Sequence, residues 1–180
     1  MKTRYILLIV ILLVLVVYLW SAKNNVQESL DYANAKHRAQ DFEHITIIMK
    51  NSIPDTLDLY NNNFTEKELS LYKHSLANAI SALDLKRTKL TTIEYSYDND
   101  YNLSESIEEF QFLMYEIIEN AGAIDEDIFY QMGDLITDYS NELGEKNYRE
   151  ESVQDFFDQS TKLVNEMNQE IRDLVKTDSQ

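Results

Sequence analysis

The chain has no cysteine, one proline and three glycines among its 180 residues. The absence of cysteine excludes disulfides and a bacterial lipoprotein, so an exported domain of this chain must be stabilised by its core alone. The scarcity of glycine and proline leaves few of the turns that a multi-stranded sheet needs. The composition therefore predicts an all-α protein. Twelve Tyr and seven Phe favour a packed bundle over a slender coiled coil.

Basic residues are also scarce, with 16 Lys and Arg against 32 Asp and Glu and a net charge of −16. Residues 23–89 hold equal numbers of basic and acidic side chains, whereas residues 90–180 hold five basic and 23 acidic ones. We expect no nucleic-acid partner, because binding one requires many clustered Lys and Arg residues to neutralise phosphates. A negative surface can simply keep the protein soluble, or its acidic helices can face a cationic partner or divalent ions.

An uninterrupted apolar run from residue 5 to residue 20 follows Lys2 and Arg4 and precedes Lys23. A helix of about 18 residues rises about 27 Å, close to the ~30 Å thickness of the bilayer hydrocarbon. We therefore predict a transmembrane signal-anchor helix over residues 5–22. The aromatic residues expected at the two membrane–water interfaces are Tyr5, Tyr18 and Trp20.

The alternative to an anchor is a cleaved signal peptide, which needs small residues in an A-x-A-like pattern after the apolar run. Cleavage after Ala22 would leave the bulky Trp20 two positions before the cut residue, so an uncleaved anchor is favoured. Basic residues concentrate before the run, which places the N-terminus inside. We expect a single-pass protein of a bacterial plasma membrane. Its parts are a cytoplasmic N-terminus (1–4), the anchor (5–22), an extracytoplasmic helical bundle (23–176) and a frayed tail (177–180).

Apolar residues beyond the anchor recur at three- and four-residue spacing in four long segments, which predicts helices that each bury one face. Pro54 is expected to end or kink the first helix. Thr65 and Glu68 match a capping box and open the second. Asn102 or Ser104 can cap the third.

Two glycines decide how many helices follow residue 103. Gly144 is a clear stop, whereas Gly122 either terminates the third helix or only weakens it. We expect an antiparallel bundle of four long helices after the anchor, or five if Gly122 divides the third. In the four-helix arrangement the connection at residues 95–102 lies near the membrane, and the loops at Asn61 and Gly144 share the far end.

Residues 98–109 place oxygen side chains at the alternating and final positions of a loop, the spacing that binds Ca²⁺ in an EF-hand. Leu103 stands where that loop needs glycine, and Glu105 stands where it has an apolar residue. A polar loop followed by a capped helix start explains the same residues without a metal. The candidate calcium ligands are Asp98, Asp100, Asn102, Ser104 and Glu109.

Two further patterns are weaker. Lys86, Arg87 and Lys89 form a basic cluster that could contact anionic lipid headgroups or could be a solvated helix face. Asp41 and His44 have the carboxylate-x-x-His spacing of di-iron bundles, but those sites need two such pairs.

The function that these patterns favour is not enzymatic, because the chain has no activated nucleophile for acyl transfer and no glycine-rich phosphate loop. We predict an interaction or scaffold module of the cell envelope that contacts another envelope protein. One alternative is a bundle that senses a ligand or an ion such as Ca²⁺. Another is an enzyme whose acid–base groups are carboxylates buried between helices.

Overall fold

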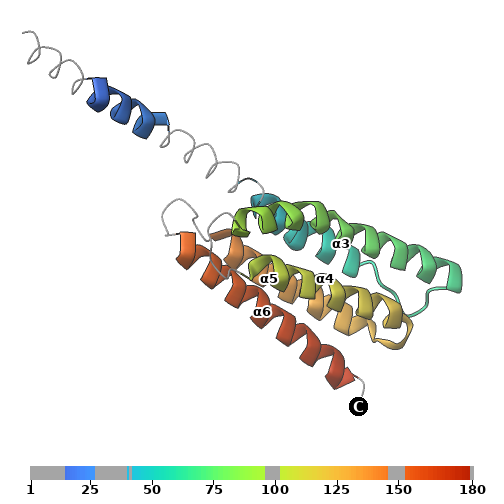
Figure 1. Cartoon of the computed structure of the whole chain (residues 1–180). Helices are drawn as coiled ribbons and strands as arrows, with labels where there is room; N and C mark the ends of the chain where they lie inside the picture. Colours follow the sequence, from blue (N-terminus) through green and yellow to red (C-terminus); the bar gives the residue numbers. More distant parts are fainter. Residues whose placement is uncertain (1–14, 27–39, 41, 96–101, 146–152, 179–180) are drawn as a thin grey trace, which may run out of the picture. The chain divides into compact units, whose positions relative to one another are not determined.

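Figure 1 shows the computed structural model of the chain, which describes residues 15–26, 40, 42–95, 102–145 and 153–178. Nearly all of these residues are helical and none of them lies in a strand, which confirms the predicted all-α class. The chain divides into two compact units, Met1–His37 and Arg38–Gln180.

In the first unit, residues 15–26 form a helix, and its large apolar side chains are exposed. Tyr18 and Trp20 belong to this helix, whereas Tyr5 and residues 5–14 of the predicted anchor lie outside the described residues. Within the part of the chain that the structure describes, no helix combines the length and apolar character that crossing a membrane requires.

The second unit begins with a helical segment, residues 42–57, whose hydrogen-bonding pattern changes along its length. Residues 42–47 are α-helical, the π-helix η1 follows at Ile48–Ser52, and α2 completes the segment at Ile53–Leu57. Pro54 lies in the first turn of α2, directly after the π-helix, and a proline without an N–H is a common place for a helix to change its hydrogen bonding. The interruption predicted at Pro54 is therefore a change of helix type within a continuing segment.

The next helix, α3 at Glu66–Tyr95, begins at the predicted capping box. The Thr65 N–H donates to Glu68 Oε2 at 2.9 Å, and the Glu68 N–H donates to Thr65 Oγ1 at 3.4 Å. These bonds satisfy amides that a helix start leaves without partners. The Thr65 hydroxyl also donates to this carboxylate at 2.6 Å, and the hydroxyl and amide bonds together lower the pKa of Glu68.

The third predicted helix is divided in two. The helix α4 at Leu103–Asn120 is followed by the 3₁₀ turn η2 at Ala121–Ala123, and then by α5 at Glu126–Glu145 and α6 at Val153–Asp178. Among the described residues, Gly122 thus lies between two helices, as in the alternative in which it divides the third helix. The chain turns at Ile124, whose backbone is extended with φ −105° and ψ 136°.

The five helical segments form a closed ring in which each packs against two others. The segment 42–57 packs on α3 and α5, α4 packs on α3 and α6, and α6 packs on α4 and α5 (Figure 1). Because five is an odd number, one neighbouring pair in such a ring must be parallel. That pair is α4 and α6: Asn168 Nδ2 donates to the Ser106 carbonyl, and Arg172, one turn later, pairs with Glu109.

The division of the third helix also changes which loops meet. The Tyr60 hydroxyl donates to the Ala121 carbonyl at 2.6 Å, and the Asn62 N–H donates to Glu126 Oε2 at 3.2 Å. The loop at residues 58–65 therefore lies at the same end as the start of α5, and the end of α5 lies at the opposite one. The prediction that the Asn61 and Gly144 loops share an end is wrong, because the extra reversal turns the last two helices around.

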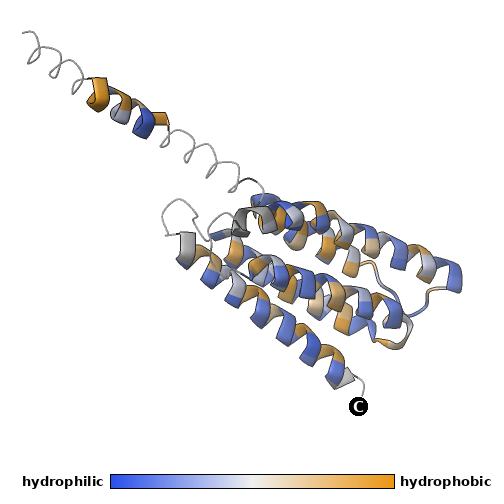
Figure 2. Ribbon diagram, in the orientation of Figure 1, coloured by the Kyte–Doolittle hydropathy of each residue, from blue (hydrophilic) through white to orange (hydrophobic). Residues whose placement is uncertain are grey.

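The core of the bundle is apolar and receives side chains from all five segments. Apolar and polar residues alternate along its helices as amphipathic helices require (Figure 2). At the end that carries residues 58–65, Tyr60 stacks on Phe129 with ring centroids 4.0 Å apart, and Tyr72 meets Tyr60 at 5.2 Å. The largest fully buried side chains are Phe110, Phe129, Phe156 and Phe157.

Candidate functional site

Among the described residues, the buried polar side chains are all uncharged. An acid–base pair between helices therefore has no buried Asp, Glu or His to use in that part of the chain. His44 and His74 are exposed, whereas Asp41 and His37 lie outside the described residues. The buried polar residues are Thr46, Thr56, Ser104, Ser106, Gln111, Ser140, Ser160 and Asn168.

Of the five candidate calcium ligands, Asp98 and Asp100 lie outside the described residues. Asn102 directly precedes α4, and Ser104 is buried in the first turn of that helix. Glu109 lies further along α4, and its carboxylate forms an ion pair with α6 at 3.7 Å.

An EF-hand keeps most of its ligands on an irregular loop of about 12 residues, whereas α4 already begins at Leu103. Residues five apart on a helix face different directions, so Ser104 and Glu109 do not converge on one point. No group of three His, Asp or Glu side chains able to hold a metal occurs among the described residues. The calcium site stays a prediction, and a rise in melting temperature with millimolar Ca²⁺ would support it.

The basic cluster of α3 does not form one surface. Lys86 Nζ lies 3.0 Å from His44 Nδ1 of the segment 42–57, whereas Arg87 pairs with Glu108 of α4 at 3.3 Å. Adjacent helix residues point about 100° apart, which explains why the two cations reach different neighbours. Lys89 is exposed. The contact of this cluster with headgroups stays a prediction.

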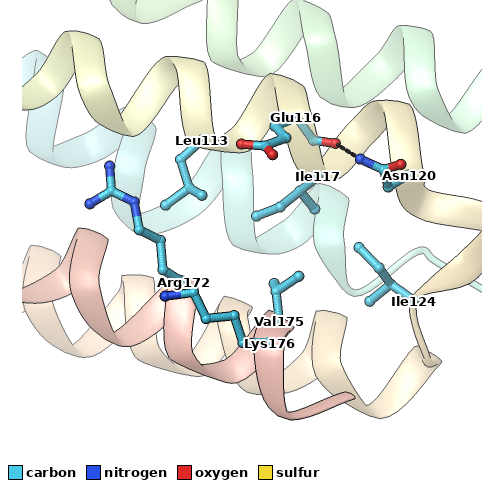
Figure 3. A pocket seen from close by; sticks show the side chains of 8 residues that line it. All are labelled: Leu113, Glu116, Ile117, Asn120, Ile124, Arg172, Val175 and Lys176. Carbon is cyan, nitrogen blue, oxygen red and sulfur yellow. Dashed lines mark hydrogen bonds between the residues drawn. The ribbon is translucent and has the colours of Figure 1, made fainter. Parts of the chain in front are cut away.

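Among the residues that the structure describes, grooves lie between neighbouring helices at three places. The α4–α6 groove has a volume of about 220 Å³ and lies between the two parallel helices, beside the connection to α5. Figure 3 shows its apolar side chains converging from both helices, with Arg172 and Lys176 extending along one side. Its lining residues are Leu113, Glu116, Ile117, Asn120, Ile124, Arg172, Val175 and Lys176.

The charges of this groove differ between its two walls. The α6 wall carries Arg172 and Lys176, one helical turn apart, and the α4 wall carries Glu116 and Asn120. Arg172 lies 3.7 Å from the Glu109 carboxylate, and Lys176 lies 3.7 Å from Asp173. Ion pairs this exposed contribute little to stability, so the two cations can accept other carboxylates.

The α5–α6 groove lies on the other side of α6 and has a volume of about 340 Å³. Asp134 and Asp138 of α5 and Glu170 of α6 make it acidic. The Tyr139 hydroxyl donates to Glu170 Oε1 at 2.8 Å. Partial burial, this hydrogen bond and the neighbouring carboxylates raise the pKa of Tyr139 to about 12, because each of them disfavours the phenolate.

The third groove, between α3 and α4, has a volume of about 220 Å³. Charged groups form part of its lining, because Arg87 pairs there with Asp84 at 3.1 Å as well as with Glu108. Phe112 lies at its rim and is 67% exposed. The α4–α6 groove thus differs from the other two in combining an apolar floor with two cations on one wall.

The sequence patterns did not single out Arg172 and Lys176. The available signal was a pair of basic residues four apart within a strongly acidic segment, but its meaning depends on α6 lying parallel to α4. Comparison with protein-family models, curated proteins and solved structures finds no match for this chain.

Proposed function

We propose that this chain is a membrane-anchored, non-enzymatic interaction module of the bacterial cell envelope. In this proposal residues 5–22 span the plasma membrane with the N-terminus inside. The helical bundle then lies outside the cytoplasm and binds another envelope protein.

Two properties of the sequence support the membrane part of the proposal. The apolar run has the length of a bilayer span, and the basic residues Lys2 and Arg4 precede it. The test is N-terminal sequencing of the protein purified from membranes. A sequence that begins at Lys23 or later would replace the anchor by a cleaved signal peptide.

The observation that carries the binding part is the α4–α6 groove. Val175 is only half-buried and lies beside this hollow, between two cations of α6 and the Glu116 carboxylate of α4. An apolar hollow rimmed by polar groups is typical of an interaction site.

Site-specific photo-crosslinking in bacterial cells that produce the full chain tests this function. A photo-reactive amino acid at Asn120 in the groove should crosslink to an envelope protein that mass spectrometry identifies repeatedly. The matched control is the same probe at Asn78, an exposed asparagine of α3 away from this groove. Equal recovery from both positions, or no protein from either, would contradict an interaction through this surface.

A further inference from the structure

We propose that the α4–α6 groove receives an amphipathic helix of the partner protein, with acidic residues on one flank of that helix and basic residues on the other. This inference rests on the proposed function and specifies the chemistry of the partner. The acidic flank faces Arg172 and Lys176 of α6, and the basic flank faces Glu116 of α4.

The position of the groove follows from the parallel pairing of α4 and α6. The two helices are joined early in their shared length by Asn168, which donates to the Ser106 carbonyl. Toward their C-terminal ends the apolar side chains of Leu113, Ile117 and Val175 face a hollow of about 220 Å³. The two helices that form the walls of the groove therefore run in the same direction.

The size of the hollow favours side chains of a docked protein over an enclosed small molecule. Sites that enclose ligands usually have volumes of about 300–1,000 Å³ and bury most of the ligand. A smaller open groove suits apolar anchors that project from one face of a helix at three- and four-residue spacing. Val175 is half-buried at this floor, and the almost fully buried Ile117 and Ile124 lie beneath it.

The cations on the α6 wall define the acidic flank of the partner. Arg172 and Lys176 are two of the five basic residues in the segment 90–180, and they lie four apart on one helix face. Their side chains are 39% and 69% exposed. A partner helix with carboxylates one turn apart can pair with both.

The helix macrodipole explains only part of this arrangement. Lys176 lies in the last turn of α6, where a cation offsets the negative helix end. Arg172 lies further from that end, where the effect of the dipole has decayed. It pairs with Glu109, and because this ion pair is exposed, a carboxylate of the partner can take the place of Glu109.

The opposite wall defines the basic flank and disfavours a second copy of this chain as the occupant. Glu116 is exposed on the α4 wall, so this wall attracts cations. Two copies that each carry a net charge of −16 repel each other. A partner helix with acidic residues on one flank and basic residues on the other can form ion pairs with both walls. It can do so in only one orientation.

The experiment maps the partner segment that crosslinks at Asn120 and measures binding of that segment, as a synthetic peptide, to the full chain in detergent. The double substitution Arg172→Glu and Lys176→Glu should weaken peptide binding tenfold or more. Exchanging the acidic residues of the peptide for lysine should restore binding to this variant but not to the wild-type chain. The matched control is Lys162→Glu, which changes an exposed lysine of α6 outside the groove and should leave binding unchanged.

A second variant separates recognition from misfolding. Glu116→Lys changes the other wall and should weaken the same peptide, while melting temperatures show that both variants remain folded. Wild-type affinity in the Arg172 and Lys176 variant would overturn this inference and leave the proposed function standing. A crosslinked product with the mass of two copies of this chain would overturn it too. Failure to recover any protein with the wild-type chain would instead contradict the proposed function.

Discussion

At the scale of single residues, Asn168 makes a specific contact between the two parallel helices. Its side chain is fully buried, and Nδ2 donates to the Ser106 carbonyl at 3.0 Å. Its Oδ1 has no hydrogen-bond partner among the described residues. A buried amide with one end unsatisfied stabilises little, so we infer that Asn168 acts mainly by fixing the register of α4 and α6.

We predict that Asn168→Asp lowers the free energy of unfolding by about 3 kcal/mol or more at neutral pH, because it buries an unpaired charge. Asn168→Leu has a similar shape and should change this free energy by less than about 1.5 kcal/mol, since the hydrogen bond and the unsatisfied oxygen disappear together. Urea unfolding followed by circular dichroism measures both variants. Equal losses would show that shape, rather than charge, governs this position.

The capping box at Thr65 and Glu68 should make stability depend on pH. Because the folded state lowers the pKa of Glu68, its contribution is present above the ordinary value of 4.5 and is lost as the pH falls through the lowered pKa. Glu68→Gln should therefore lower the melting temperature at pH 7 and have a smaller effect at acidic pH. The melting temperatures of the two proteins at several pH values give this difference, and a pH-independent difference would contradict the assignment.

Residues that act within one helical turn were predictable from the sequence, and those that act across helices were not. Thr65 and Glu68 could be assigned because both partners of the capping box lie three residues apart. Arg172 and Lys176 gained their meaning only when α6 was placed beside α4. The pairing of α4 and α6 follows from the whole ring, which no local pattern encodes.

At the scale of elements, the end of α4 illustrates the same limit. The sequence left Gly122 undecided, and its backbone is not in the left-handed conformation that would have made glycine necessary. The turn forms with Ile124 extended and with the Ala121 carbonyl bound by Tyr60, a residue far away in the chain. Tertiary contacts therefore fix this helix end, which explains why local signals were ambiguous.

The glycines of α5 provide a prediction at the same scale. A Cβ on Gly133 would lie 3.1 Å from Asp58 Oδ1 and 3.8 Å from the Pro54 Cα, whereas a Cβ on Gly144 would meet nothing within 4 Å. We expect Gly133→Leu to lower the free energy of unfolding by about 1–3 kcal/mol, because it overpacks the contact with α2. Gly144→Ala should raise it by up to about 1 kcal/mol through helix propensity.

Urea unfolding of the two variants decides between packing and propensity as the role of Gly133. A loss in Gly133→Leu together with a gain in Gly144→Ala is expected if close approach of α5 to α2 requires the glycine. An unchanged free energy of unfolding in Gly133→Leu would mean that α5 and α2 can move apart without loss of stability.

At the scale of the whole molecule, the net charge of −16 opposes the compact state. The acidic residues are concentrated in the later helices, and Glu105, Glu116 and Glu119 are exposed on α4. No Lys or Arg is buried among the described residues. The apolar core must overcome this repulsion. The sign of this charge and its position along the chain follow directly from the sequence.

Salt should therefore stabilise the fold. Raising the salt concentration from about 10 mM to about 150 mM shortens the Debye length from ~30 Å to ~8 Å and screens repulsion between exposed carboxylates. We expect the melting temperature of the full chain in a non-ionic detergent to rise over this range. A fall would mean that attractive ion pairs outweigh the repulsion.

The odd number of segments in the ring also determines where the chain leaves the bundle. In an antiparallel bundle with an even number of helices, the chain begins and ends at the same end of the bundle. Here residue 178 lies at the end opposite residue 42. At about 1.5 Å per residue, the 26 residues of α6 alone cover about 39 Å. Two fluorophores attached at residues 42 and 178 would therefore be separated by roughly the length of α6.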